Sequence, residues 1–365
     1  MGARERERIG LNFIRPDAGR PGNHDFLRSG EWLVSQFSEL GVRWNRLAFS
    51  WVVIQPEKDR FDWEPYDRVV DACRKAGIEI LATLGGHFDR PPVPAWAGES
   101  LASVISDHPE YLENFMKAWV ARYRDRIRHW EMLNEPRTHH AGLTVQQYVE
   151  GVLKPGFRIV KAADPALMVL PCAFDQLPVR GDRESFWDSA RGHYDIHNLH
   201  HYQDWGLFRT EPVAAREEKS VRWFRNEMEK HGEGNKPFWV TEIGWWGTGS
   251  LDGKHEYYRK DPATGHEFRT SYLGKEIIGH PVVMREDALR AEWLADLFPR
   301  ILAVPGCEKA FLWVSLDEFE GGFDPDRAYG RSGERQVDLW GIIAGDRTWR
   351  PSAHVLREIL GGDHG

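Results

Sequence analysis

Short apolar runs alternate with longer amphipathic stretches along most of the 365-residue chain. The apolar runs are rich in β-branched and aromatic residues and have the length of buried strands. We expect eight strands, at residues 9–13, 43–49, 78–84, 129–134, 167–173, 195–202, 237–243 and 309–316. The stretches between them predict helices, among them 31–41, 66–77, 111–126 and 286–302, and residues 351–360 predict a last helix. Several of these end near a glycine, as helix C-termini prefer.

Strands that alternate with helices indicate an α/β fold with a parallel sheet. Eight such units close naturally into a (β/α)8 TIM barrel, and we expect a single domain over residues 1–365 with its core at about 9–360. An open doubly wound sheet is the main rival. It would usually carry a glycine-rich phosphate turn after its first strand, and residues 10–19 make a poor one.

Two connections, both leaving the carboxyl ends of predicted strands, are long. Residues 246–284 follow the seventh strand and contain a predicted hairpin at 257–272, whose tip holds Pro262 and Gly265. Residues 317–340 follow the eighth strand and are rich in Asp, Glu and Gly. Loops of this length on a compact barrel are usually functional or disordered, so we interpret both as walls of a binding cleft.

Composition limits the classes of binding partner and the cellular compartment that we expect for this protein. The formal net charge of -8 argues against nucleic acid or an anionic membrane as the main partner. No membrane-spanning run and no signal-peptide core follow Met1, so we expect a cytoplasmic protein, although a removed leader would leave export open. Cys73, Cys172 and Cys307 are scattered in apolar contexts and are expected to be buried free thiols. The 17 tryptophans suit both a core and a surface that stacks sugar rings. The oligomeric state is not determined by these features.

The stretch HWEMLNEP places an amide and a carboxylate, Asn134 and Glu135, where Pro136 forces the chain out of the sheet. A second acid, Glu242, ends the seventh predicted strand in the stretch PFWVTEIGWW. Strands four and seven of an eight-stranded ring face each other obliquely across its mouth, where barrel chemistry is placed. Their side chains can converge to the roughly 5 Å gap of a retaining glycosidase. Either acid alone would be interpreted as a salt-bridged strand end.

With these motifs the chain resembles glycoside hydrolase clan A, the barrel superfamily of retaining β-glycosidases, from Gly10 to about Leu360. Residues 134–136 resemble the acid/base motif of the clan and residues 241–244 its nucleophile motif. Residues 45–63 are similar to the clan pattern of Arg, Trp, Pro and Phe-x-Trp, and 118–136 to a run in the β-xylosidase and α-iduronidase family. Leu133 stands where many relatives carry Trp, and TEIG replaces the TENG of the β-glucosidase family, so no family is assigned.

The resemblance implies double displacement, with Glu242 as nucleophile and Glu135 as acid/base. Glu242 must be ionised, and Arg46 and Tyr202 are the expected donors that keep it so. The charge on Glu242 would disfavour ionisation of Glu135 until Glu242 becomes esterified. Asn134 would bind the sugar 2-hydroxyl.

Further substrate contacts are implied at four other positions. His200 belongs to a His-x-Tyr motif and is expected to touch substrate or to support the site from behind. His87 resembles a sugar-contacting histidine of the β-glucosidase family, with a core histidine as the alternative. Trp313 matches the sugar platform of the clan, and Glu320 is either a hydroxyl ligand or part of an ordinary acidic loop.

No cofactor and no metal are expected, because metal-dependent barrel hydrolases usually open with a His-x-His pair and residues 9–13 have none. The expected function is a retaining glycoside hydrolase acting on β-linked carbohydrate. A transglycosylase that uses the same intermediate, or a catalytically silent carbohydrate-binding barrel, remains an alternative.

Overall fold

The computed structural model describes residues 2–13, 24–85, 93–136, 143–174, 180–202, 214–244, 259–260, 267–268, 281–313, 315, 341–343 and 348–361. Two predicted site residues, His87 and Glu320, lie outside these ranges, as does most of the two long connections. Among the described residues, no helix combines the length and the apolar character needed to cross a membrane.

Eight parallel strands form one sheet that curls into a nearly closed barrel, so the predicted (β/α)8 TIM barrel is confirmed. The order around the sheet is β5-β4-β3-β2-β1-β10-β7-β6. The strands are β1 (Ile9–Phe13), β2 (Trp44–Phe49), β3 (Glu79–Leu84), β4 (His129–Glu131), β5 (Met168–Leu170), β6 (His197–Tyr202), β7 (Phe238–Gly244) and β10 (Cys307–Leu312). Between β5 and β6, the carbonyl of Val169 accepts hydrogen bonds from the backbone N–H groups of Asp195 and Ile196.

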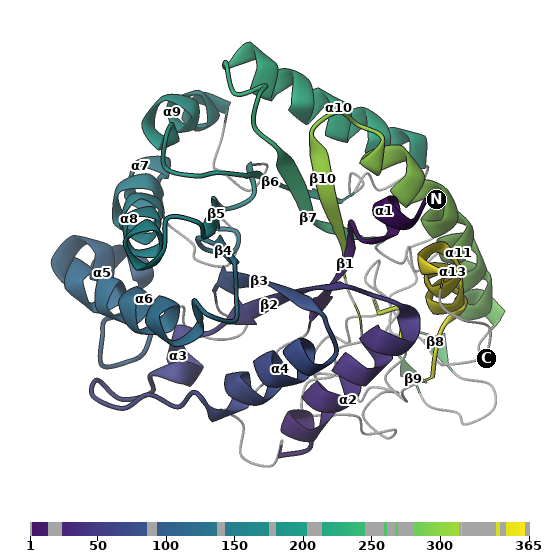
Figure 1. Ribbon diagram of the computed structural model, residues 1–365, viewed down its shortest axis with the longest axis horizontal. Coiled ribbons are helices and arrows are strands. Elements are labelled where there is room, and N and C mark those ends of the chain that lie inside the picture. Colours follow the sequence, from purple (N-terminus) through teal and green to yellow (C-terminus); the bar gives the residue numbers. More distant parts are fainter. Residues whose placement is uncertain are drawn as a thin grey trace.

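Helices surround the strands on the outside of the ring (Figure 1). The longer ones are α2 (His24–Leu40), α4 (Glu64–Lys75), α6 (Pro109–Tyr123), α8 (Lys154–Ala163), α9 (Arg180–Ala190), α10 (Ala214–Lys230), α11 (Pro281–Leu302) and α13 (Pro351–Leu360). Shorter segments are α1 (Ala3–Arg6), α3 (Trp51–Ile54), α5 (Leu101–Asp107), α7 (Val145–Tyr148) and the π-helix η1 (Val149–Leu153). The predicted hairpin is confirmed by antiparallel pairing of β8 (Arg259–Lys260) with β9 (Glu267–Phe268).

The helices bury one face against the sheet, as their sequence period dictates. In α4 the buried positions Tyr66, Val69, Val70 and Cys73 are spaced three and four residues apart and form one stripe. Acidic residues occupy the first turn of α4 and basic residues its last turn. Both interact favourably with the helix dipole and stabilise the helix. All three cysteines are buried free thiols, as predicted.

The barrel interior is built in layers, because alternate residues of each strand point inward. The lower layer is apolar and aromatic and contains Trp44, Leu81, Leu170, Ile196, Trp239 and Phe311. Trp44 packs edge-on against Trp239 with ring centroids 5.2 Å apart. Gly10 of β1 lies beside this layer, and a Cβ at that position would overlap the ring of Phe311.

The layer above is polar, and four of its five residues lie two positions after a residue of the lower layer. It consists of Arg46, Thr83, Glu131, Asn198 and Thr241, which are all buried. A polar layer inside a barrel requires internal partners, since water cannot satisfy it. It lies directly below the carboxyl ends of the strands, where the candidate site is found.

Candidate active site

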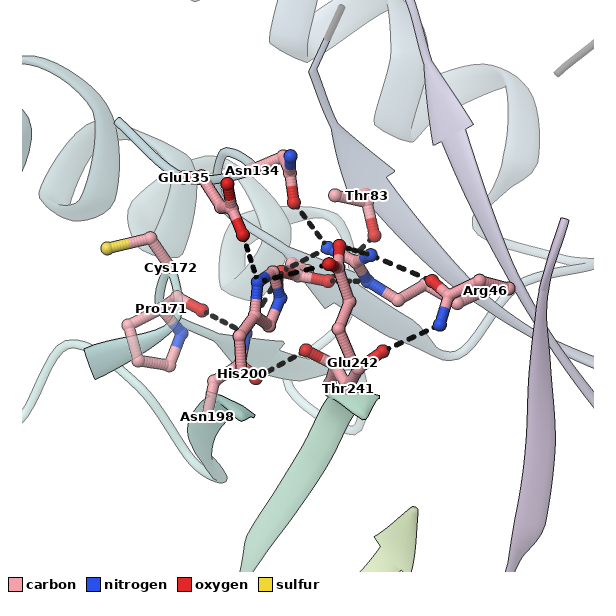
Figure 2. A network of polar contacts seen from close by, with 12 residues as sticks. Arg46, Thr83, Asn134, Glu135, Pro171, Cys172, Asn198, His200, Thr241 and Glu242 are labelled. Atoms are coloured by element: carbon pink, nitrogen blue, oxygen red, sulfur yellow. Dashed lines mark hydrogen bonds and ion pairs between the residues drawn. The ribbon is translucent and has the colours of Figure 1, made fainter. Parts of the chain in front are cut away.

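Arg46 is the centre of the polar layer, and its guanidinium group uses all five of its N–H donors. Nε and Nη2 donate to the two carboxylate oxygens of Glu131, at 2.6 and 2.8 Å. Nη1 donates to Glu242 Oε1 at 2.5 Å and to Asn12 Oδ1 at 2.8 Å. Nη2 also donates to Asn134 Oδ1 at 2.7 Å. Figure 2 shows how these contacts converge on the arginine from several strands.

This arrangement fixes the charge of Arg46. Burial disfavours its cationic form, but the carboxylates of Glu131 and Glu242 outweigh burial and hold the pKa of Arg46 above its ordinary value. The guanidinium therefore remains a permanent cation although it is buried. Its rigid fork sets the positions of four acceptor side chains at once.

Glu242 is positioned by β7 and by two strong donors. Arg46 donates to Oε1, and the hydroxyl of Tyr202 donates to Oε2 at 2.5 Å. Burial, and after it the charge of Glu242, holds the pKa of Tyr202 well above its ordinary value, so the phenol keeps its proton. The carboxylate thus accepts hydrogen bonds from one cationic and one neutral donor.

A β-bulge in β7 aims Glu242 into the barrel. Leu199 pairs with Val240 and His200 pairs with Glu242, so Thr241 is the extra residue on β7. The hydroxyl of Thr241 donates to Asn198 Oδ1 at 2.5 Å. Both Thr241 and Glu242 therefore face the interior, although neighbours in a regular strand point to opposite sides.

Glu135 reaches the same site from a turn that follows β4. This strand ends at Glu131, earlier than predicted, because Leu133 has a φ of 82° and leaves the sheet. Glu135 itself has a φ of 35° and is 7% exposed. Its Oε1 lies 2.7 Å from Nδ1 of the fully buried His200.

His200 lies between the two carboxylates, since its Nδ1 is also 3.4 Å from Glu242 Oε2. Burial lowers the pKa of His200, but the charge of Glu242 and the contact with Glu135 outweigh it, and the net direction is upward. The role of His200, either a substrate contact or support of the site, stays a prediction. One oxygen of Glu135, one of Glu242 and a ring nitrogen of His200 all lie within 4.8 Å of one another.

Carboxylate oxygens and histidine nitrogens are common metal ligands, and Glu135, His200 and Glu242 provide three of them close together. However, Arg46 and Tyr202 already donate to the two oxygens of Glu242, and His200 Nδ1 is engaged with Glu135. A cation would have to compete with a guanidinium that is fixed by five hydrogen bonds. We therefore assign no metal to these residues.

The structure brings together most of the residues predicted from the sequence. Asn134, Glu135, Arg46, His200, Tyr202 and Glu242 form one connected network. Trp313 is partly buried one residue beyond β10, and its backbone N–H donates to the carbonyl of Ile243, next to Glu242. His87 and Glu320 lie outside the described residues, so their roles stay predictions.

Glu131 is the main site residue that the sequence analysis missed. It is fully buried and accepts four hydrogen bonds, two from Arg46, one from Thr83 and one from Asn198. A signal was present, because an acid inside the apolar run HWEMLN is costly unless it is paired. Its partners, however, come from strands far away in the sequence.

His197 and His201, the other two histidines of β6, lie away from the carboxylate pair. His197 is enclosed by aromatic rings, among them Trp187 at 4.8 Å and Phe224 at 5.2 Å between centroids. His201 Nε2 lies 2.5 Å from the buried carboxylate of Glu217, in the first turn of α10.

Comparisons with known proteins show similarity to glycoside hydrolases. The family model for "Glycosyl hydrolase family 1" matches residues 24–170. The chain is 30% identical over 141 residues to endo-1,4-beta-xylanase A of Fusarium oxysporum, a match that covers 36% of this chain and 41% of that protein. It is 29% identical over 140 residues to beta-glucosidase 14 of Arabidopsis thaliana, covering 36% of this chain and 26% of that protein. The match thus spans less than half the length of these curated relatives.

Among solved structures, a family 39 glycoside hydrolase from Bacteroides cellulosilyticus aligns over 99% of this chain and 64% of its own, with a TM-score of 0.65 and 17% identity. At this identity the likeness concerns the fold. The resemblance to clan A glycoside hydrolases inferred from the sequence motifs is confirmed, while the family within the clan is not assigned.

Proposed function

We propose that this protein is a retaining glycoside hydrolase that cleaves β-linked glycosides or oligosaccharides. The observation that carries the proposal is the pair Glu135 and Glu242, because one carboxylate oxygen of each lies within 4.8 Å of the other at the mouth of the barrel. Retaining enzymes hold their two carboxyl groups about 5–5.5 Å apart, whereas inverting enzymes need roughly 6.5–9.5 Å to admit a water. The names of the matched relatives, a xylanase and a β-glucosidase, support β-linked carbohydrate as the substrate class.

The two carboxylates differ in their environments, and this difference assigns their roles. Glu242 receives a guanidinium and a phenol, which stabilise its negative charge. Glu135 is held by His200, while the Arg46 donors are directed to other groups. Glu242 is therefore the nucleophile and Glu135 the group that carries the proton.

In the first step, an oxygen of Glu242 forms a bond to the anomeric carbon while the glycosidic C–O bond breaks. The proton of Glu135 passes to the leaving oxygen, and Glu135 becomes a carboxylate. In the second step, water attacks the anomeric carbon, its proton goes to Glu135, and the ester bond to Glu242 breaks. Two inversions give net retention.

Asn134 is oriented for a contact with the sugar. Because its Oδ1 accepts from Arg46, its Nδ2 is the group that would donate, and we assign the sugar 2-hydroxyl, beside the anomeric carbon, as its acceptor. Such a bond strengthens as charge develops in the transition state.

The test is a screen of the purified protein against nitrophenyl β-glycosides and short β-linked oligosaccharides, with Glu135→Gln and Glu242→Ala alongside. We expect cleavage by the wild type, loss of turnover in Glu242→Ala, and partial recovery with azide to give a product of inverted configuration. Turnover unchanged in Glu242→Ala would contradict the mechanism. Transfer of the sugar to an added acceptor in place of water would identify the same site as a transglycosylase.

A further inference from the structure

The turn that carries Glu135 is strained, so contacts with the surrounding structure must stabilise it. Leu133 and Glu135 both have positive φ angles, 82° and 35°, although neither is a glycine. Such conformations cost of order 1–3 kcal/mol each and persist only where the surroundings over-determine them. On one side, β3 supplies this support, because Asn134 N–H donates to the carbonyl of Leu84 at 2.8 Å.

On the other side, the support comes from a buried tyrosine that lies outside the catalytic motifs. The hydroxyl of Tyr148, the last residue of α7, donates to the carbonyl of Met132 at 2.9 Å. That carbonyl belongs to the peptide group immediately before the φ of Leu133. Tyr148 is 1% exposed, and burial holds its pKa well above the ordinary value, so the hydroxyl remains a donor.

The same hydroxyl accepts a hydrogen bond from the backbone N–H of Cys172 at 2.6 Å. The carbonyl of this peptide group, on Pro171, accepts from Asn198 Nδ2 at 3.0 Å. Figure 2 shows Pro171 and Asn198 beside the polar layer. Asn198 in turn contacts Glu131 and Thr241, so the peptide after β5 is fixed from the barrel interior.

These contacts form a continuous path from the barrel interior through Asn198, the 171–172 peptide and Tyr148 to the 132–133 peptide. The outer end of the path is anchored by the capping box of α7, in which Thr144 Oγ1 accepts from the N–H of Gln147 at 3.1 Å. A single hydroxyl therefore connects the rigid end of β5 to the strained turn that carries the acid/base.

We propose that Tyr148 is a positioning residue, which sets the direction of Glu135 by fixing the peptide group before Leu133. The inference rests on the proposed function of Glu135. Its consequence is selective, because Glu242 is held by Arg46 and Tyr202, whereas the hydroxyl of Tyr148 is hydrogen-bonded to the peptide groups of Met132 and Cys172. Losing the Tyr148 hydroxyl should impair protonation of the leaving group and spare the attack by Glu242.

The experiment is Tyr148→Phe, which removes one oxygen and keeps the ring. Two aryl glycosides of the sugar that the wild type cleaves fastest are compared. The dinitrophenyl glycoside has a leaving group that departs without a proton, whereas the unsubstituted phenyl glycoside needs one. We expect kcat/KM for the phenyl substrate to fall roughly 10- to 100-fold, since acid catalysis contributes about 10²–10⁴-fold when well positioned. The kcat/KM of the variant for the dinitrophenyl substrate should stay within about threefold of the wild-type value, because cleavage of this substrate does not require acid catalysis.

Tyr66→Phe is the matched control. Tyr66 is also fully buried, and its hydroxyl accepts from a backbone N–H at a strand end, that of Ser50, at 3.0 Å. We expect this variant to lose stability as Tyr148→Phe does, but to keep the wild-type ratio between the two substrates. A milder variant, Thr144→Ala, loosens α7 from an exposed position and should give a smaller loss confined to the phenyl substrate.

Equal losses on both substrates in Tyr148→Phe and Thr144→Ala, or no loss in either, would overturn the inference. In a Glu135→Ala background, Tyr148→Phe should have no further effect, and an additional loss there would also overturn it. These outcomes are separate from failure of the proposed function, which would appear as inactive wild type or an active Glu242→Ala.

Discussion

Replacing Glu131 by Gln tests whether the buried carboxylate below the site organises it. Oε1 of Glu131 accepts from Arg46 Nη2 and Asn198 Nδ2, and Oε2 accepts from Arg46 Nε and Thr83. A glutamine with its oxygen at the Oε1 position keeps the first two bonds. Its amide nitrogen then lies opposite Arg46 Nε–H, so two donors face each other and this hydrogen bond is lost. The hydroxyl of Thr83 can rotate and accept a hydrogen bond from the amide instead.

The magnitude follows from these contacts. A charge-assisted hydrogen bond contributes about 1.5–3 kcal/mol, and a buried donor left without an acceptor costs about 1–3 kcal/mol. Removing one partner of a buried ion pair costs about 3–5 kcal/mol in general, and Arg46 retains Glu242 as a second partner. We therefore expect Glu131→Gln to lower the free energy of unfolding by about 3 kcal/mol.

The kcat/KM of Glu131→Gln should also fall, and by more than a loss of folded protein would explain. Once Arg46 is released on one side, its contacts with Glu242 and Asn134 shift, and a displacement of about 1 Å can cost roughly 100-fold in rate. The assays are urea unfolding at neutral pH and kcat/KM on the best aryl glycoside. Glu233→Gln is the control, since Glu233 is also buried and paired, with Lys236 at 3.0 Å, but precedes β7 at the opposite end of the barrel. It should lose stability and keep its activity.

The reasoning would be refuted by a Glu131→Gln protein whose unfolding free energy and kcat/KM both match those of the wild type. Such a result would mean that Arg46 is positioned by Glu242 and the asparagines alone.

Two further predictions concern single contacts. Tyr202→Phe removes the hydroxyl that donates to Glu242 Oε2, and kcat should fall roughly 100- to 1,000-fold, as for loss of one preorganised donor. An effect confined to KM would argue against this role. Burial, and after it the charge of Lys236, lowers the pKa of His197 to about 3, so the folded protein excludes a proton that the unfolded chain binds near pH 6.5. The stability that His197 contributes is therefore present above about pH 6.5 and is lost as the pH falls toward 3. Between pH 7 and 4.5, the unfolding free energy of His197→Phe should therefore decline by roughly 3 kcal/mol less than that of the wild type. Parallel profiles of unfolding free energy against pH for the two proteins would exclude this role of His197.

The sequence by itself determined the fold class and the identity of the two carboxylates. Hydrophobic periodicity is a local property, and each of the eight predicted strands is present in the barrel. The motifs around Asn134, Glu135 and Glu242 are also local, and their order along the chain, at the ends of the fourth and seventh strands of the barrel, was enough to place both acids at one mouth.

The tertiary structure decided how the acids are held. Arg46 and Glu242 are separated by 196 residues, and Arg46 and Glu131 by 85, so no local pattern could pair them. The bulge at Thr241 depends on the register of β7 against both neighbouring strands. The early end of β4 reflects the strained turn after it, which long-range contacts with Tyr148 and Leu84 stabilise against its local preference. Backbone propensity is set by neighbours in the chain, whereas these contacts exist only once distant strands have closed into the barrel.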